Sequence, residues 1–276
     1  MPPAATTSIT SNTAAARLPS LYVPHGGGPC FFMDDPDGTW TGMGQFLGEL
    51  PASLPMQPRA ILVVSGHWET SGFMLTANPK PSLLFDYYGF PPHTYQLRYD
   101  APGAPDLALR AAQLLRNAGY SAGLDAQRGL DHGVFVPLKV IYPLAQLPVV
   151  ELSLDRSLDA SLQLAVGRAL APLRDEGVLL LCAGMSFHNL RALGDARATV
   201  PAQQFDAWLG HAVSLPGAER ANMLEHWQDA PAARFCHPRP EHLLPLMVAA
   251  GASESPGQRI FNEQVLGTMI SGFSFA

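Results

Sequence analysis

The chain has 276 residues, enough for one large α/β domain or two small ones with a substantial core. Hydrophobic residues make up 47% and charged residues 14%, and the net charge is −6, which is typical of a globular protein and excludes a basic nucleic-acid-binding protein. No apolar run approaches the roughly 20 residues that cross a bilayer. We therefore expect neither a nucleic-acid nor a membrane partner.

The three cysteines are odd in number, lie far apart and form no CxxC motif: Cys30, Cys182 and Cys236. This pattern excludes a zinc ribbon or a disulfide framework and indicates a reducing compartment, so we expect a cytoplasmic protein. The first 16 residues are rich in Ala, Thr and Ser and contain no apolar segment of a secretory signal. We expect a disordered N-terminal tail over residues 1–17 and a single folded domain over residues 18–276.

Short apolar runs alternate with patterns of helical spacing along the chain. In the first half, strands are predicted over residues 18–23 and 61–66, with a further strand over 72–77 beside the latter, and helices over 41–50 (ended by Pro51) and 104–118. Residues 80–103 are rich in Pro, Gly and aromatic side chains. A long irregular segment of this kind is more typical of a functional loop than of a linker.

The second half continues the alternation. The predicted strands cover residues 120–123, 148–154 and 178–182, and the predicted helices cover 134–142 (with Pro137 near its start), 157–174, 202–213, 217–227 and 243–250. This order predicts an α/β fold, a single domain with a central, mostly parallel or mixed β-sheet flanked by helices. Ligands bind such sheets at the rim formed by the carboxyl ends of the strands.

Histidines follow three of the predicted strands. His25, His67 and His188 each come within a few residues of a strand end, and His132 and His242 lie in loops of similar character. Because the carboxyl ends of parallel strands meet at one rim, we expect these side chains to share a site. Imidazole is the commonest protein metal ligand and titrates near neutral pH, so the pattern predicts a site that holds a divalent metal and moves protons.

The sequence leaves open the roles of several histidines and the identity of the metal. His237 competes with His242, His93 lies in the aromatic loop without a clear role, and His211 and His226 fall inside predicted helices and are expected at the surface. Imidazoles without thiolates favour zinc, iron or copper over magnesium or calcium, and the spacing does not decide between Zn(II) and Fe(II). The chain contains neither HExxH nor GxSxG, which excludes the common zinc peptidase and serine hydrolase patterns.

Six ordered motifs carry a family resemblance: Tyr22-Val-Pro-His25-Gly-Gly-Gly-Pro, Val63-Val-Ser-Gly-His67-Trp, Asp86-Tyr-Tyr-Gly-Phe-Pro91, Leu130-Asp-His132-Gly-Val-Phe, Ser186-Phe-His188-Asn-Leu and Pro240-Glu-His242-Leu-Leu-Pro245. With them the chain resembles the class III extradiol ring-cleavage dioxygenases of the LigB-like superfamily, and within it the DOPA 4,5-dioxygenase-like branch. The resemblance extends from about residue 18 to near the C-terminus, so it implies that the whole of residues 18–276 is a catalytic domain.

The resemblance implies roles for individual residues. His25, His67 and His242 match the metal ligands, with His242 where better-known LigB-type enzymes use a glutamate. His188 matches the acid/base histidine, and a second role as fourth metal ligand is left open. His132 matches a histidine that faces the substrate. The aromatic loop would cover the substrate ring, with the substrate-binding residues Tyr88, Phe90 and His93.

The implied activity is cleavage of the aromatic ring of a catechol-type substrate by O2, with Fe(II) as the expected cofactor and Zn(II) as the alternative bound metal. Two other interpretations are a zinc-dependent hydrolase at the same histidine site and a non-enzymatic metal-binding protein of the same fold. Four arginines are candidate partners for a substrate carboxylate: Arg98, Arg128, Arg191 and Arg239. No feature of the sequence names the catechol or indicates an oligomeric state.

Overall fold

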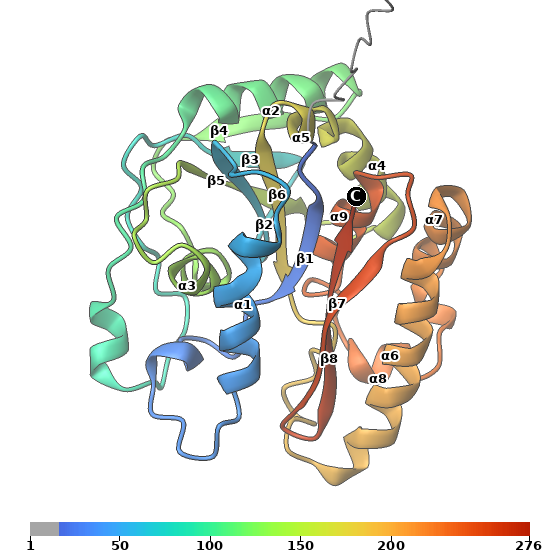
Figure 1. The fold of residues 1–276 in the computed structure, drawn as a ribbon. Helices are drawn as coiled ribbons and strands as arrows, with labels where there is room; N and C mark the ends of the chain where they lie inside the picture. The colour runs from blue at the N-terminus through green and yellow to red at the C-terminus, as the bar shows by residue number, and fades with distance from the viewer. Residues whose placement is uncertain (1–16) are drawn as a thin grey trace, which may run out of the picture.

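The computed structural model describes residues 17–276, so the predicted tail over residues 1–17 lies outside the described residues apart from Arg17. A mixed eight-stranded sheet runs through the molecule in the order β4-β3-β5-β2-β6-β1-β8-β7, with helices on both faces (Figure 1). The predicted α/β fold with a mixed central sheet is confirmed. No helix among the described residues is long and apolar enough to cross a membrane.

The four central strands are parallel and buried. The strands are β1 Ser20–Pro24, β2 Ala60–Thr70, β3 Phe73–Thr76, β4 Ala122–Asp125, β5 Val149–Asp155, β6 Val178–Gly184, β7 Gln258–Val265 and β8 Thr268–Phe275. β2 pairs with β5 and β6, and β6 pairs with β1, all in parallel. Because both faces of these strands are covered, β6 and the first part of β2 are continuous apolar runs, whereas β5 carries the buried polar residues Glu151 and Ser153.

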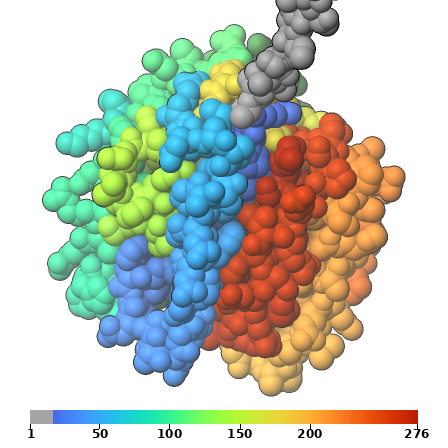
Figure 2. Space-filling model, viewed as in Figure 1, coloured from blue at the N-terminus to red at the C-terminus, as the bar shows by residue number. Residues whose placement is uncertain are grey.

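Helices cover the two faces of the sheet. They are α1 Thr41–Ser53, α2 Pro105–Asn117, α3 His132–Ile141, α4 Ala160–Leu170, α5 Pro172–Asp175, α6 Thr199–Ser214, α7 Gly217–Glu225, α8 Ala233–Cys236 and α9 Leu244–Gly251. α1 packs against α3 and against β7, where Phe46 stacks on Phe261 with ring centroids 4.8 Å apart. α1 and the C-terminal hairpin therefore lie side by side on the face shown in Figure 2.

Prolines account for three corrections to the predicted helices. α1 continues past Pro51 to Ser53, α3 begins at His132 and contains Pro137, and the helix predicted over 157–174 is divided at Pro172 into α4 and α5. A proline removes one N–H donor and strains the preceding turn, and its effect depends on whether other contacts hold that turn. Sequence spacing does not show those contacts.

Two strand predictions also need correction. The strand expected beside residues 61–66 is β3, which pairs with β4 and β5, and β5 separates it from β2. The hairpin of β7 and β8 was not predicted. Its turn residues Leu266 and Gly267 both have positive φ, 47° and 79°. Such a turn usually carries Asn-Gly or Asp-Gly, so Leu-Gly gave no turn signal.

Candidate metal centre and active site

His67 lies inside a strand and not beyond its end. β2 continues to Thr70, and its pairing with β5 shifts register between Val64 and Glu69. A β-bulge of this kind changes the direction of nearby side chains and is common beside active sites. The predicted boundary at Gly66 is therefore wrong. The expected position of His67 near the rim stands, because the pairing of β2 with β6 ends at Ser65, just before His67.

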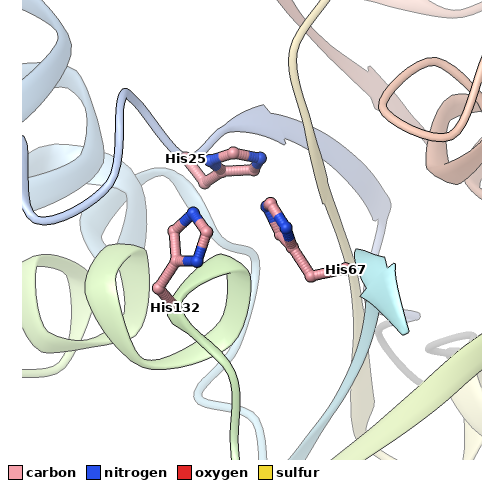
Figure 3. A group of neighbouring side chains, drawn as sticks. All are labelled: His25, His67 and His132. Carbon is pink, nitrogen blue, oxygen red and sulfur yellow. The ribbon is translucent and has the colours of Figure 1, made fainter. Parts of the chain in front are cut away.

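Three histidines from distant parts of the chain converge at this rim. His25 directly follows β1 and donates its backbone N–H to the Gly184 carbonyl at 3.1 Å, and His132 is the first residue of α3. The ring centroids lie 5.0 Å apart for His25 and His67, 4.0 Å for His67 and His132, and 5.6 Å for His25 and His132 (Figure 3). One nitrogen from each ring lies within 4.8 Å of the others.

His242 reaches the same point from the loop before α9. Its carbonyl accepts hydrogen bonds from Tyr22 Oη at 2.8 Å and from the Met185 N–H at 3.1 Å. A β-carbon at Gly184 would collide with that carbonyl, so only glycine permits this close approach. The Nε2 atom of His242 lies 3.1 Å from Nε2 of His67, which joins His242 to the first three histidines.

His188 completes the cluster. Its ring stacks on that of His242, with centroids 3.4 Å apart and planes inclined by 17°. Its backbone N–H donates to the Cys236 carbonyl at 3.0 Å, which fixes the loop after β6. All five histidines that the sequence predicts for the site are therefore brought together.

The remaining histidines lie elsewhere. His237 is fully buried between Phe205 and Trp227, and its Nε2 lies 2.9 Å from the Ser186 carbonyl, so it is not part of the cluster. Of the two competing histidines, His242 is therefore the one that lies in the cluster. His211 in α6 and His226, which directly follows α7, are exposed, as predicted.

Asp86 supports two of the rings from the aromatic loop. Its Oδ1 accepts the backbone N–H of His132 at 3.0 Å and lies 2.7 Å from Nδ1 of that ring, and its Oδ2 lies 3.6 Å from Nδ1 of His67. Burial raises the pKa of Asp86, but the hydrogen bonds from His132 outweigh burial and lower it, so the group is a carboxylate at neutral pH. The sequence motif contained Asp86, but nothing in its spacing indicated this contact.

Glu241 contacts two further histidine rings, on the other side of the cluster. Its Oε1 lies 3.0 Å from Nδ1 of His242 and 3.2 Å from Nδ1 of His188. Burial raises its pKa, but the hydrogen bond from His188, a backbone hydrogen bond and the positive charges of His188 and Arg239 together outweigh burial and lower it. A carboxylate only accepts hydrogen bonds, so Nδ1 of each ring donates to Glu241, and in the neutral form of such a ring Nε2 keeps its lone pair. Metal-binding histidines commonly have this arrangement.

The rings are held in the neutral form that binds metals. Burial first, and then the neighbouring histidines, lower the pKa of His25 and His242 well below the usual value and that of His67 to about 4. Both ring nitrogens of His25 are buried and have no hydrogen-bond partner among the described residues. Unpartnered buried imidazole nitrogens beside two Nε2 lone pairs fit a transition metal that prefers nitrogen ligands.

The lowered pKa values predict how the metal-free protein responds to acid. Four histidines have a lower pKa in the folded chain than in the unfolded chain: His25, His67, His237 and His242. Below pH 6.5 they are therefore protonated in the unfolded chain while they stay neutral in the folded chain. We therefore expect the free energy of unfolding to be greatest above pH 6.5 and to fall as the pH is lowered toward 5, by roughly 1.4 kcal/mol per bound proton and pH unit. Urea unfolding of chelator-treated protein at pH 7.5, 6 and 5 measures this, and constant stability would contradict it.

A cavity of about 460 Å³ opens beside the histidines. Its lining includes the five clustered histidines and the aromatic loop residues Tyr87, Tyr88 and Phe90. Tyr87 contacts His132 edge to face, with centroids 5.6 Å apart. His93 is not among the lining residues; it is exposed, and its Nε2 lies 3.0 Å from the Phe32 carbonyl. The cavity thus includes two of the three predicted substrate contacts.

Part of the cavity wall was missed by the sequence analysis. It comes from the unpredicted C-terminal hairpin, from the loop after β6 and from the start of α1: Trp40, Met185, Phe187, Leu190, Leu193, Val265, Leu266, Thr268 and Ile270. Most of these side chains are ordinary apolar residues, and only Phe187 and Leu190 lie in one of the six motifs, which gave them no role. Only the pairing of β8 with β1 brings the hairpin to the rim.

The family described as "Catalytic LigB subunit of aromatic ring-opening dioxygenase" matches residues 33–274 of this chain. The chain belongs to the LigB family. The family and the chain's relatives confirm the prediction that the chain is an extradiol, ring-cleaving dioxygenase. The protein is therefore an enzyme that uses O2 and depends on a metal. The hydrolase and the non-enzymatic interpretation are not favoured.

Several relatives cover most of the chain. A protein of Beta vulgaris named 4,5-DOPA dioxygenase extradiol is 40% identical over 78% of this chain and 82% of its own length. The Escherichia coli protein of the same name is 37% identical over 87% and 86%, and Dioxygenase tasH of Hapsidospora irregularis is 35% identical over 94% and 86%. The crystal structure of an uncharacterized Escherichia coli K12 protein superimposes with a TM-score of 0.75, at 30% identity over 94% of this chain and all of that one.

Proposed function

We propose that this LigB-family enzyme cleaves the ring of a catechol with O2 and that His25, His67 and His242 hold its metal. The observation that carries the ligand set is the orientation of the rings. The Nε2 atoms of His67 and His242 face each other at 3.1 Å, each with its Nδ1 toward a carboxylate, and His25 lies beside both with two unpartnered nitrogens.

We propose Fe(II) as the active metal. Catechol cleavage by O2 requires a metal that exchanges electrons, whereas Zn(II) has no redox chemistry. Zn(II) binds nitrogen sites more tightly than Fe(II), so it is the metal most apt to replace iron during purification. When bound, the metal acidifies the catechol hydroxyl and brings the substrate close to O2.

His188 and His132 are placed to accept protons or hydrogen bonds from the substrate hydroxyls. Nδ1 of His188 donates to Glu241 Oε1 at 3.2 Å, which leaves its Nε2 free to accept a proton from the substrate hydroxyl and to return one later. His132, with Nδ1 on Asp86 at 2.7 Å, presents Nε2 as a hydrogen-bond acceptor for the second hydroxyl. Tyr87 and Phe90 supply aromatic walls for the ring and exclude water.

The direct test is oxygen consumption. The protein is stripped with a chelator, loaded anaerobically with Fe(II) or with Zn(II), and mixed with catechols and air-saturated buffer. We expect stoichiometric O2 uptake and a yellow semialdehyde product with iron and none with zinc. Equal O2 uptake with zinc would contradict the assignment of Fe(II), and ester or amide hydrolysis without O2 would support the hydrolase; either result would overturn this proposal.

Asp86 offers a second test through its support of His132 and His67. Replacement by asparagine keeps the shape but removes the charge, so we expect metal affinity or kcat/KM to fall by roughly 10- to 100-fold. Asp100→Asn is the matched control, because Asp100 lies further along the same segment and forms an exposed ion pair with Arg98 at 2.8 Å. An Asp86→Asn enzyme within twofold of the wild type in both quantities would exclude this role.

A further inference from the structure

The cavity wall away from the histidines is apolar. Of the lining side chains, all within the described part of the chain, none is Lys, Arg, Asp or Glu. Apart from the histidines, the polar groups are the hydroxyl of Thr268, the tyrosine hydroxyls and the indole N–H of Trp40, and the Tyr87 hydroxyl already donates to the Thr94 carbonyl. Outside the histidine cluster, the lining therefore offers no side chain of permanent charge to pair with a charged substituent.

The candidate arginines are engaged elsewhere. Arg128 lies 3.0 Å from Asp131 and 3.5 Å from Glu151, and its guanidinium stacks 4.4 Å above the Trp68 ring. These contacts satisfy its charge within the protein, away from the cavity lining.

Arg239 donates two hydrogen bonds to Glu69 in a bidentate ion pair, each 2.6 Å long, and its guanidinium lies 3.4 Å from the Glu241 carboxylate. Arg98 pairs with Asp100 at the surface. Arg191 is exposed and follows the lining residue Leu190, but it is not itself among the lining residues. Of the four candidate partners for a substrate carboxylate, Arg191 is therefore the one whose removal is tested below.

An apolar collar, defined here as Leu190, Leu193, Val265 and Leu266, lines the outer part of the cavity. The Gly194 N–H donates to the Leu266 carbonyl at 2.9 Å, which holds the loop after β6 against the hairpin turn. Leu190 is 68% exposed and Leu266 40% exposed. In the same lining, Val265 is buried and Leu193 is half-buried. Exposed leucines that line a binding cavity are typical of a surface that a ligand covers.

We propose that the ring substituent of this enzyme's catechol is apolar and uncharged, and that the apolar collar binds it. This inference rests on the proposed catechol cleavage. The histidine end provides for the two ring hydroxyls, while a carboxylate at the collar would lose its hydration without gaining a cation or hydrogen-bond donors. An alkyl or aryl substituent gains from the same burial.

The test uses the Fe(II)-loaded full chain and compares catechols with alkyl substituents of increasing length, and then an alkyl substituent with charged substituents of similar length. We expect kcat/KM for O2 uptake to rise about fourfold per methylene from 4-methyl- to 4-propylcatechol. We expect 4-propylcatechol to exceed 3-(3,4-dihydroxyphenyl)propionate and DOPA by at least about tenfold, mainly through KM. Anaerobic binding titrations should give the same order without turnover. If no catechol consumes O2, the proposed function fails; if carboxylates are preferred, only this inference fails.

Substitutions on the apolar collar test whether this surface sets the substrate preference. Leu190→Arg places a cation on the collar and should raise kcat/KM for the propionate while lowering that for 4-propylcatechol, whereas Leu190→Gln should lower only the latter. Leu109→Arg is the matched control, because Leu109 is an exposed leucine on α2, outside the lining of this cavity. A wild-type preference for carboxylates that disappears in Arg191→Ala would overturn the proposal and identify Arg191 as the carboxylate partner.

Discussion

A His25→Ala enzyme is expected to lose its metal and with it all measurable ring cleavage. His25 is buried, its two ring nitrogens have no partner among the described residues, and its ring lies 5.0 Å from those of both His67 and His242. Removing a ligand should cost more affinity than the roughly 10- to 100-fold typical of removing a ligand's hydrogen-bond partner.

The measurement is metal content after equal loading, together with Tm with and without metal. A metal that binds only the folded state raises Tm by an amount that grows with the logarithm of its affinity, so the wild type should gain thermal stability from Fe(II) or Zn(II) and His25→Ala should not. His211→Ala is the control, because His211 is exposed on α6 and should behave as the wild type. One equivalent of metal bound to His25→Ala with unchanged affinity would remove His25 from the ligand set.

Replacing His188 by alanine is expected to lower kcat by about 10²- to 10⁴-fold, the usual contribution of a positioned acid/base group. We expect the metal to stay bound, because His25, His67 and His242 remain. Added imidazole should restore part of the activity by entering the space that the ring leaves.

The same variant separates the two roles open for His188. Unchanged metal affinity with low kcat and rescue by imidazole identifies an acid/base residue, and a parallel loss of metal identifies a fourth ligand. A kcat within a few-fold of the wild type would exclude both roles. His226→Ala is the control, because His226 is exposed and its Nδ1 lies 2.8 Å from the Asn222 carbonyl.

The location of the site followed from local patterns. Buried parallel strands are recognisable as short apolar runs, and their carboxyl ends share a rim, so a histidine after several such runs predicts a common site. His25, His67 and His188 show that this reasoning does not need exact boundaries, since β2 extends to Thr70 and the site is unchanged.

Other features depend on contacts between segments far apart in the chain. Asp86 and His132 are 46 residues apart, and the Nε2 atoms that face each other at 3.1 Å belong to His67 and His242, 175 residues apart. His237 and His242 have similar sequence surroundings, yet one bonds the Ser186 carbonyl in the core and the other joins the cluster. No local pattern distinguishes them.

By itself, then, the sequence determined the α/β class, the rim and the histidines gathered there, because strand formation and side-chain chemistry are encoded locally. Only the tertiary structure decided which histidines meet, which carboxylates orient them and which side chains line the cavity. The collar illustrates the reason. Leu266 is an unremarkable residue in an unrecognised turn, and it reaches the cavity only because β8 pairs with β1 and Gly194 binds its carbonyl.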